Sequence, residues 1–448
     1  MSNSYHFIGI GGIGMSGIAR LLLSQGMAVS GSDIASNGMT NTLAHAGAVI
    51  YEGHAEKNLP LESTVIYSSD IKSDNPEYQA ALKNGSKLIH RSDMLAELLA
   101  AKKALAVTGT HGKTTVSSLL STVLVEANLD PCFAVGGIIK SSGCNSRWGK
   151  GDFFSFEADE SDRSFLKYHP YGAIITNIDN DHLVNFENNF DCLLEHFRTF
   201  IYQVKSPAHV FWCCDDSHLS KMEINGQSFG FNSKSDWKIS RAVQHGFRMI
   251  FDIENRGNLY KNIELSLTGM HNVLNATAVF GLCIHLGIPE KNIRRTLESF
   301  QGVSRRCENK GNWKGIDFID DYAHHPTEIR ATLEAIKHAT KERRLVAVFQ
   351  PHRYSRIIDC LGFYGTIFNQ ADQIIITDIY AAGESPLPHI SHAVIQKEIE
   401  ENSPVPHCYI PRPDLSCFLR KFLQKGDVLV TLGAGDITRL TNEIICHE

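Results

Sequence analysis

The sequence predicts an α/β protein of three domains, and three observations lead to this prediction. The chain has 448 residues, which is too long for one ordinary hydrophobic core. Two segments, residues 5–23 and 104–124, each pass from an apolar strand through a glycine-rich turn into an amphipathic helix. A further alternation of strands and helices begins after Gly302. We therefore expect domains at residues 1–103, 104–302 and 303–448.

Hydrophobic patterning gives the expected elements of each domain. Further strands of the first domain are expected at residues 28–32, 64–68 and 87–90, with the domain boundary near residues 100–103. The second domain is expected to have strands at 153–156 and 173–176, a helix at 190–204, a β-rich stretch at 226–267 and a helix that begins near Asn272. The third is expected to have strands at 316–319, 345–349, 373–377 and 428–432. Strands that alternate with helices predict parallel sheets.

Composition excludes several classes of protein. The 43% hydrophobic and 21% charged residues are typical of a globular chain, and the net charge of -6 predicts no nucleic-acid-binding surface. The one basic run, residues 337–344, is expected to be a solvated helix end. Residues 1–6 lack the pattern of an export signal, and no apolar run is long enough to cross a membrane. Eleven cysteines without a C-x-x-C pair favour a reducing compartment, so we expect a cytoplasmic protein. Separately, we expect a monomer or a homodimer.

A glycine pattern follows the first strand. Gly9, Gly11 and Gly14 form G-x-G-x-x-G ahead of a helix, and Asp33 comes 19 residues after Gly14. Glycines at this spacing let a pyrophosphate approach backbone N–H groups at the helix start. The pattern alone leaves open whether NAD, another pyrophosphate or only a helix-packing turn is involved.

A second loop, Gly109-Thr110-His111-Gly112-Lys113-Thr114, follows the strand at 104–107 and resembles a phosphate-binding loop. The usual first glycine is replaced by Val107. The chemistry nevertheless holds, because the two glycines expose N–H groups, Lys113 can reach terminal phosphates and Thr114 can offer its hydroxyl to Mg²⁺.

Carboxylates follow the next strands. The run from Glu157 to Asp162 ends one predicted strand, and Asp181-His182 comes after another. Oxygen ligands of this kind are those that Mg²⁺ selects, although an acidic run is more often solvated surface.

His271, Asn272 and Asn275 open a helix, where they could cap it or contact a base. Two strand-end clusters of the third domain, 320–326 and 350–356, combine His and Arg, which suit carboxylate or phosphate binding.

Taken in order, seven segments resemble the motif series of the Mur ligases: GIGGIGMSGIA, GTHGKTT, EADESDRSFL, NIDNDH, HNVLNA, DDYAHHPTEI and QPHRYSR. The resemblance implies a Rossmann-like N-terminal domain that binds a UDP-sugar, a central P-loop ATPase-type domain and a Rossmann-like C-terminal domain that binds the amino acid and closes over the site. It also implies ATP-dependent joining of L-alanine to UDP-N-acetylmuramate in peptidoglycan precursor synthesis, with ATP as a substrate and Mg²⁺ as the metal.

The resemblance also implies a role for each motif residue. The catalytic residues would be Lys113, Glu157, His182 and His324, and the metal ligands Thr114, Glu157 and His182. ATP would be bound by Gly109, Thr110, His111, Gly112, Lys113, Thr114, Thr115, His271, Asn272, Asn275, Arg306 and Asp321. The UDP-sugar would be bound by Gly9, Gly11, Gly12, Gly14 and Asp33, and the amino acid by His324, Arg353 and Arg356.

Some residues depart from the family pattern, and the sequence leaves three other functions to consider. Ser68-Ser69-Asp70 replaces the more usual SSA, Leu183 to Asn185 lacks the common acidic residue, and residues 183–204 contain no lysine that could be carbamoylated. A murein-peptide ligase is disfavoured because Ser161 stands where those enzymes usually have Tyr. An NAD-dependent oxidoreductase leaves Lys113 unexplained, and a non-catalytic nucleotide sensor leaves the metal and nucleophile-positioning residues unexplained.

Overall fold

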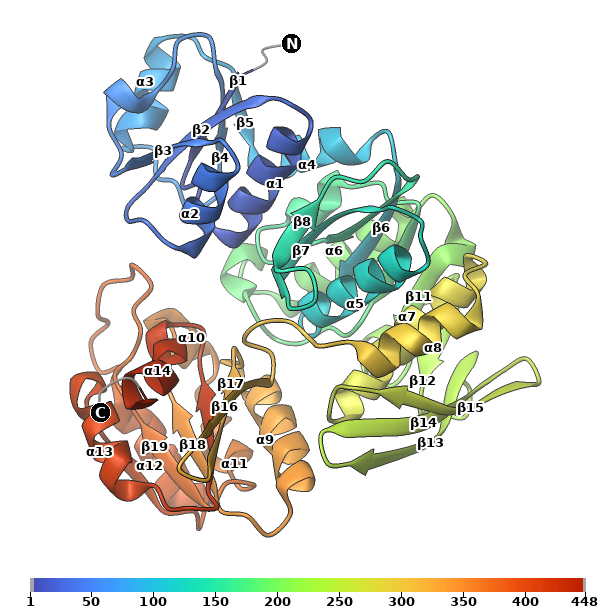
Figure 1. The fold of residues 1–448 in the computed structure, drawn as a ribbon, viewed down its shortest axis with the longest axis vertical. Helices are drawn as coiled ribbons and strands as arrows, with labels where there is room; N and C mark the ends of the chain where they lie inside the picture. Colours follow the sequence, from blue (N-terminus) through green and yellow to red (C-terminus); the bar gives the residue numbers. More distant parts are fainter. Residues whose placement is uncertain (1–3, 446–448) are drawn as a thin grey trace. The chain divides into compact units, whose positions relative to one another are not determined.

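The computed structural model describes residues 4–445 and contains three sheets, each flanked by helices (Figure 1). The predicted three-domain α/β architecture is therefore confirmed. By compactness the described chain divides into two units. The first runs through Ser240 and includes Asp252–Ile263 and Leu274–Gln301; the second comprises Arg241–Phe251, Glu264–Val273 and the described residues from Gly302 onward. The boundaries expected after residues 103 and 302 stay predictions.

The N-terminal sheet has five parallel strands in the order β3-β2-β1-β4-β5. Its elements are β1 Ser4–Ile8, α1 Ile13–Ser24, β2 Ala28–Asp33, α2 Gly38–His45, β3 Val49–Glu52, β4 Thr64–Tyr67, α3 Pro76–Lys83, β5 Leu88–His90 and α4 Arg91–Leu99. The strands expected at 28–32, 64–68 and 87–90 are confirmed, whereas the short β3 was not anticipated. Helices α1 and α2 lie on one side of the sheet and α3 on the other (Figure 1).

A buried polar network fixes the inner strands of this sheet to α3. Glu77 is fully buried and accepts hydrogen bonds from Ser32 Oγ at 2.5 Å and Asn58 Nδ2 at 2.8 Å, and its Oε2 lies 3.2 Å from His6 Nε2. Burial by itself would raise the pKa of Glu77, but the hydrogen bonds from His6, Ser32 and Asn58 lower it below its ordinary value. The carboxylate is thus charged, and it ties β1 and β2 to α3.

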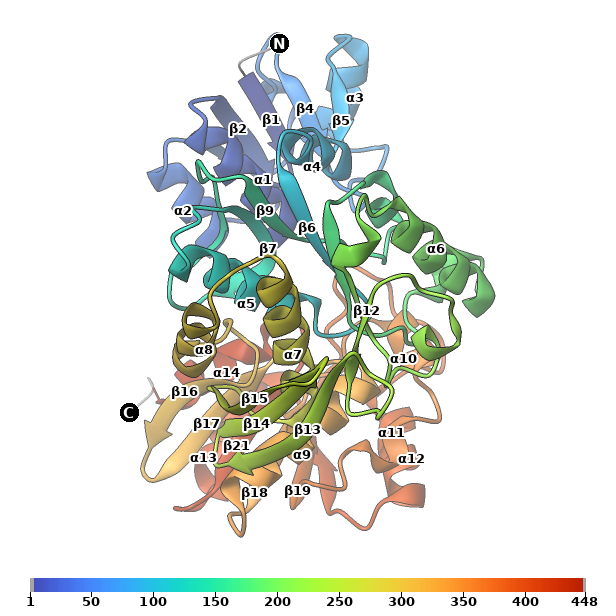
Figure 2. The ribbon, with the colours of Figure 1, turned by 90° about the vertical axis from the view of Figure 1, so that its right-hand side faces the viewer.

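The central sheet is the largest, with the order β15-β14-β13-β12-β11-β10-β6-β9-β7-β8. Its elements and their helices are β6 Lys103–Thr108, α5 Lys113–Glu126, β7 Cys132–Ile139, β8 Cys144–Arg147, β9 Phe153–Glu157, β10 Gly172–Ile175, α6 Phe190–Gln203, β11 Val210–Cys213, β12 Gln227–Gly230, β13 Trp237–His245, β14 Arg248–Asn255, β15 Asn258–Leu265, α7 Met270–His285 and α8 Glu290–Ser299. Helix α8 packs beside α5 (Figure 2). The β-rich stretch is confirmed as β12 to β15, but the hairpin β7-β8 and strand β11 were missed.

The hairpin β7-β8 links the first two sheets within the first unit. Helix α1 packs against both of its strands, and Asn145 Nδ2 donates a hydrogen bond to the carbonyl oxygen of Ile13 at 2.7 Å. A Cβ atom at Gly17 would lie 3.3 Å from Asn145 Nδ2. The small residue on α1 therefore permits the close approach of the two domains.

The C-terminal sheet has the order β16-β17-β21-β18-β19-β20, and only β16 runs antiparallel. Its elements are β16 Glu308–Trp313, β17 Ile316–Asp321, α9 Pro326–Thr340, β18 Leu345–Phe349, α10 Tyr354–Asp359, α11 Tyr364–Ile367, β19 Gln373–Ile376, α12 His392–Asn402, β20 His407–Tyr409, α13 Leu415–Phe422, β21 Val428–Leu432 and α14 Leu440–Ile445. All four strands expected here are confirmed. The basic run at 337–344 begins in the last turn of α9, as expected.

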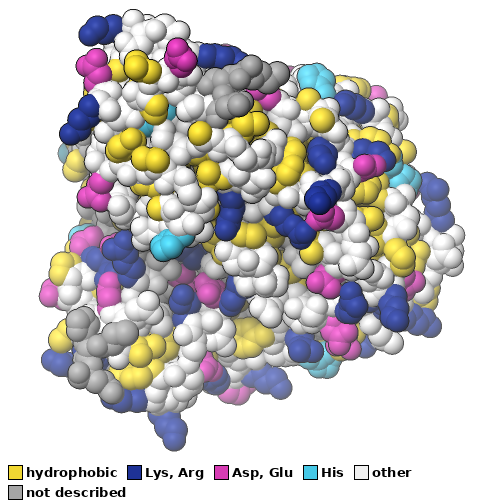
Figure 3. Space-filling model, turned by 45° about the horizontal axis from the view of Figure 1, so that its top comes forward, with side chains coloured by type: hydrophobic (Ala, Val, Ile, Leu, Met, Phe, Trp, Pro, Cys, Tyr) yellow, Lys and Arg dark blue, Asp and Glu magenta, His cyan; other side chains and the backbone are white. Residues whose placement is uncertain are grey.

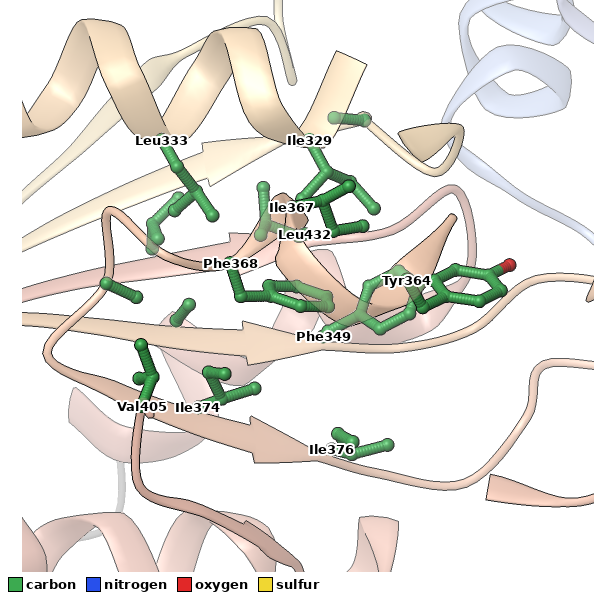
Figure 4. Packing of buried hydrophobic residues seen from close by; sticks show 14 of the residues in the cluster. Ile329, Leu333, Phe349, Tyr364, Ile367, Phe368, Ile374, Ile376, Val405 and Leu432 are labelled. Atoms are coloured by element: carbon green, nitrogen blue, oxygen red, sulfur yellow. The ribbon is translucent and has the colours of Figure 1, made fainter. Parts of the chain in front are cut away.

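Strand β18 shows why both faces of this sheet are covered. Leu345, Ala347 and Phe349 pack with α9, α11 and α12, whereas Val346 and Val348 pack with α13 and α14. A strand buried on both faces is apolar at every position, which is the pattern of a parallel sheet between two helical layers. Figure 4 shows Phe349 against Tyr364 and Phe368 in the first of these cores.

Three further features concern apolar helices, cysteines and surface charge. Within residues 4–445 no helix is both long and apolar enough to span a membrane. The ten cysteines of the same residues are free thiols; Cys446 and residues 1–3 lie outside the described part. On the face shown in Figure 3, Lys and Arg side chains are interspersed with Asp and Glu.

Replacing Phe349 by Ala should lower the free energy of unfolding of the C-terminal domain by about 3–5 kcal/mol, because a fully buried ring would leave a cavity. Hydrogen exchange of β18 and β21 during a urea titration measures the loss. Phe363→Ala is the matched control, since Phe363 is 58% exposed and should change the value by less than about 0.5 kcal/mol. Equal losses in the two variants would contradict the position of Phe349 in the core.

Candidate active site

The phosphate-binding loop joins β6 to α5, and its shape depends on both glycines. Gly109 has a φ of +130° and Gly112 a φ of +83°, and Gly112 directly precedes the first turn of α5. A Cβ atom at Gly109 would lie 2.1 Å from Thr176 Oγ1. Glycine is thus required at Gly109 by space as well as by conformation. Thr114 and Thr115 lie in the first turn of α5.

The loop that follows β10 holds the phosphate-binding loop in place. Asn177 Oδ1 accepts the N–H of His111 at 2.8 Å, and Thr110 Oγ1 accepts the N–H of Asp179 at 2.9 Å. The ring Nε2 of His111 lies 2.9 Å from Asp179 Oδ2. Sequence reasoning did not single out Asn177 or Asp179, although they follow the strand that pairs with β6.

Lys113, the first residue of α5, is held inside the phosphate-binding loop. Its Nζ donates to the carbonyl oxygens of Gly109 at 2.7 Å and Thr110 at 3.1 Å, and to Glu160 Oε1 at 2.9 Å. Burial alone would lower the pKa of Lys113, but the carboxylates of Glu160 and Asp159 outweigh it and raise this pKa above its ordinary value. Burial raises the pKa of Glu160 to about 7. Lys113 is therefore a permanent cation, and Glu160, which was not among the predicted site residues, is its partner.

Glu157 and Thr114 meet at the adjacent strand end. Thr114 Oγ1 donates to Glu157 Oε2 at 3.0 Å, and the N–H of Gly136 donates to the same oxygen at 3.0 Å. A hydroxyl beside a carboxylate is a set of oxygen donors that fits Mg²⁺. His182 follows β10, has a φ of +59°, and places Nε2 at 3.4 Å from Asp181 Oδ2. Because β6 lies between β9 and β10, the phosphate loop leaves the sheet between the strand ends that precede Glu157 and His182.

The first glycine loop brings Gly11 and Asp33 together, as its spacing predicted. The N–H of Gly11 donates to Asp33 Oδ2 at 2.7 Å. A Cβ atom at Gly11 would lie 2.5 Å from Asn37 Nδ2 and 2.8 Å from Asp33 Oδ2, so this position requires glycine. Gly9 has a φ of +81°, and Gly12 directly precedes α1. The structure thus forms the predicted turn at the start of this helix.

The first turns of α7 carry the three residues expected to face adenine. In the first unit, Asn275 packs on the phosphate loop, since a Cβ atom at Gly112 would lie 3.0 Å from Asn275 Oδ1. In the second unit, Asn272 Nδ2 donates to the carbonyl oxygen of Thr268 at 2.8 Å and lies 3.1 Å from His271 Nε2. Asn272 therefore also stabilises the segment that leads into α7.

The C-terminal domain gathers His324 and Arg356 around His352, which belongs to the cluster predicted at 350–356 but was given no role of its own. The rings of His324 and His352 are 5.7 Å apart, and Arg356 Nη1 lies 3.4 Å from His352 Nδ1. The ring of Tyr380 is nearly parallel to that of His352, with ring centroids 5.8 Å apart. Burial, together with the nearby charges of His324 and Arg356, lowers the pKa of His352 to about 3, so this imidazole is neutral.

Asp321 is the last residue of β17, and Arg306 precedes β16 in the same domain. Asp321 accepts the N–H of Cys307 at 2.6 Å and the N–H of Ala323 at 2.7 Å, and burial raises its pKa to about 6. The Arg306 guanidinium lies 5.2 Å from the ring of Tyr322. Both carboxylate oxygens of Asp321 thus accept backbone hydrogen bonds, which fix the loop after β17.

Comparison with known proteins identifies the family of this chain. Profiles described as "Mur ligase family, catalytic domain", "Mur ligase middle domain" and "Mur ligase, glutamate ligase domain" match residues 4–103, 107–283 and 305–435. The chain is 57% identical to the UDP-N-acetylmuramate–L-alanine ligase of Protochlamydia amoebophila over 99% of this chain and 98% of that enzyme. This chain belongs to the Mur ligase family.

Two more relatives extend the comparison. The chain is 41% identical to the bifunctional enzyme MurC/Ddl of Chlamydia caviae over 99% of its own length, and it spans about half, 54%, of that longer enzyme. It is similar to the crystal structure of UDP-N-acetylmuramate-alanine ligase MurC from Thermotoga maritima, with a TM-score of 0.86, 29% identity and coverage of 99% and 98% of the two chains. The similarity to this structure therefore extends over the whole Mur ligase fold.

In this Mur ligase the arginines of the third domain are fixed by a distant loop. Arg353 has a φ of +63°, an unfavourable conformation for a residue with a side chain, and its N–H donates to the carbonyl oxygen of Tyr380 at 2.9 Å. Glu384 accepts the N–H of Ser355 at 3.1 Å and its hydroxyl at 2.6 Å. Glu384 therefore holds the first turn of α10, the helix that carries Arg356. Sequence reasoning missed Glu384 because it lies in a loop with no strand or helix pattern.

Lys113→Ala should lower kcat at least about 10²-fold, because a preorganised cation at the phosphate loop is lost. The fold should persist, since the buried Glu160 carboxyl can take up a proton once its partner is removed. Steady-state turnover and a thermal unfolding curve measure the two effects. Lys103→Ala is the control, because Lys103 is at the other end of β6 in an exposed ion pair with Asp152. Near-normal turnover of a folded Lys113→Ala enzyme would refute the role of this loop.

Arg356→Ala should raise KM for the amino-acid substrate about 10- to 100-fold and leave KM for ATP within about twofold. A charge-assisted contact to the carboxylate is worth about 1.5–3 kcal/mol, and the phosphate contacts of ATP are expected in the central domain. Initial rates with each substrate varied in turn provide both constants. Arg439→Ala, at an exposed position, is the control. Equal increases in both constants would instead assign Arg356 to phosphate binding or domain closure.

Proposed function

We propose that this Mur ligase joins L-alanine to UDP-N-acetylmuramate with hydrolysis of ATP, giving UDP-N-acetylmuramoyl-L-alanine, ADP and phosphate for peptidoglycan synthesis. The observation that carries the proposal is the 57% identity, over nearly the whole of both chains, with an enzyme named for this reaction. The phosphate loop, the acidic strand end and the His and Arg cluster of the third domain support it, because each matches one requirement of the chemistry.

The chemistry needs ATP because a carboxylate is a poor acyl donor. Its leaving group would be oxide or hydroxide, so an amine does not displace it at neutral pH. Transfer of the γ-phosphoryl group to the muramoyl carboxylate gives an acyl phosphate, from which phosphate departs readily. The neutral amine of alanine then attacks the acyl carbon, and the tetrahedral intermediate loses the amine proton and expels phosphate to give the amide.

Within the first unit, Lys113 would act on the transferring phosphoryl group. Its cation is fixed by two backbone carbonyls and by Glu160, so little reorganisation is needed when negative charge develops. Gly109 to Gly112 would cradle the phosphates with backbone N–H groups. Thr114 and Glu157 would hold Mg²⁺, which neutralises phosphate charge when bound, and His182 would lie at the same sheet edge.

The UDP-sugar and alanine would bind at two other sites, one rich in glycine and one rich in arginine. Gly9 to Gly14 and Asp33 would bind the UDP-sugar at the start of α1. His324, Arg353 and Arg356 would bind the alanine carboxylate in the second unit, since a guanidinium fork matches a carboxylate. Asn272, Asn275, His271, Arg306 and Asp321 would complete the ATP site. We place the enzyme in the cytoplasm, where free thiols persist.

The reaction class predicts where one oxygen atom goes. UDP-N-acetylmuramate labelled with ¹⁸O in its lactyl carboxylate should give phosphate that carries one labelled oxygen for each amide formed, together with ADP. Mass spectrometry of the phosphate and chromatography of the nucleotide measure both products. Unlabelled phosphate alongside amide would exclude phosphorylation of the carboxylate, and AMP with pyrophosphate would indicate adenylation.

The same assay tests the amino acid when L-alanine is replaced by glycine, L-serine or the peptide of a murein-peptide ligase. L-alanine should give the highest kcat/KM. A preference for the peptide would assign the chain to the peptide ligases instead.

A further inference from the structure

Arg91 lies at the carboxyl edge of the N-terminal sheet, where ligands of open parallel sheets bind. The order β3-β2-β1-β4-β5 has its topological switch point between β1 and β4. The glycine loop follows β1, Ser69 follows β4 and Arg91 follows β5, so all three leave the sheet at this edge. The proposed function assigns no role to Arg91 or Ser69.

The guanidinium of Arg91 faces two groups at once. Its Nη2 donates to Asp162 Oδ2 at 2.8 Å and lies 3.9 Å from Asp159 Oδ2. Its Nη1 lies on the side of the glycine loop, where a Cβ atom at Gly14 would come within 3.3 Å of it. One end of the guanidinium is therefore paired with the acidic motif, and the other lies against the first turn of α1.

Asp162 holds this arrangement together. Its Oδ2 also accepts the hydroxyl of Ser69 at 3.1 Å, and its Oδ1 accepts the N–H of Ser164 at 3.0 Å. Side-chain exposure is 27% for Arg91 and 15% for Asp162. Placing such a pair away from water brings little net stability, because desolvation offsets the attraction. The orientation of Arg91 is what the pair provides.

A diphosphate bound at the glycine loop would need a cation from outside that loop. Residues 9–14 contain no basic residue, and the N–H of Gly11 is already bonded to Asp33. The partial charge at a helix start is only about half a proton charge. Arg91 is the cation whose guanidinium contacts this turn, and a planar guanidinium matches phosphate oxygens well.

We propose that Arg91 is a substrate-binding residue that contacts the diphosphate of the UDP-sugar through Nη1, while Asp162 orients it through Nη2. The inference rests on the proposed function in one respect, namely that the glycine loop binds a UDP-sugar. It gives Ser69 and Asp162 a purpose as well, because they fix the arginine between the first and second sheets of the same unit.

Equilibrium binding to the full chain without ATP tests the proposal. Arg91→Ala should weaken the binding of UDP-N-acetylmuramate and of UDP by a similar factor, about 10- to 100-fold in Kd, measured by isothermal titration calorimetry. UDP retains the diphosphate and lacks the sugar with its lactyl carboxylate. A loss confined to UDP-N-acetylmuramate would overturn the proposal, because Arg91 would then bind the carboxylate.

Asp162→Asn separates binding from domain packing. This variant removes the ion pair, but the new amide oxygen can still accept the hydrogen bond from Nη2 and so keep the cation oriented. Kd for UDP should therefore stay within about threefold of the wild-type value. A loss as large as that of Arg91→Ala would show a packing role only. Arg91→Gln removes the charge and keeps an N–H donor for Asp162, and it should reproduce the loss even if Arg91→Ala fails to fold. Arg295→Ala, in a surface pair with Glu126, is the unrelated control.

The outcome is distinguishable from failure of the proposed function. If the wild-type chain binds both ligands but forms no amide with L-alanine, the proposed reaction is wrong while the binding data on Arg91 still hold. If it forms the amide and Arg91→Gln binds UDP as tightly as the wild type, the reaction stands and the role of Arg91 is wrong.

Discussion

Parallel pairing of β6 with β9 on one side and β10 on the other decides where the polar groups of the central domain lie. Parallel strands end at the same edge of a sheet, so the phosphate loop, the acidic motif and the loop with His182 all emerge together. Thr114 meets Glu157 and Lys113 meets Glu160 because of this pairing, although 43 and 47 residues separate the two pairs along the chain. A change of strand order would scatter the same motifs.

The groups assembled at this edge are charged and poorly hydrated, which is costly unless they are paired. Lys113 satisfies its three N–H groups with two carbonyls and Glu160, and the pair keeps the lysine protonated. Little net stability comes from such a pair, since desolvation consumes most of the attraction. Its value is electrostatic, because a cation that is largely buried and already in position interacts strongly with phosphate charge.

In the other two domains buried contacts also hold the strands that precede the functional loops, but the kinds of contact differ. In the N-terminal domain a buried, charged Glu77 joins β1, β2 and α3 below the glycine loop. In the C-terminal domain two apolar cores clamp β18, so the loop that follows it starts from a rigid strand. Glu384 and Tyr380 then fix the direction of that loop and of α10. Rigid strands with short polar loops thus place His352 and Arg356 accurately.

The sequence by itself determined most of the architecture and the identity of the motif loops. Runs such as Leu345 to Phe349 are apolar at every position and predict strands buried on both faces, and glycines such as Gly109 and Gly112 mark turns with positive φ. Both signals are local, so they can be recognised without a structure. The resemblance to the Mur ligases followed from the order of such loops.

Only the tertiary structure decided which polar residues meet. The acidic run offers Glu157, Asp159, Glu160 and Asp162, and the resemblance assigned a role to Glu157 alone. In the structure Glu157 contacts Thr114, Glu160 pairs with Lys113 and Asp162 pairs with Arg91. Likewise, only the structure shows that His352 lies beside Arg356 and that Glu384 binds Ser355. These choices depend on strand order and loop geometry, because electrostatic and hydrogen-bonding partners are selected by distance in space, which sequence separation does not encode.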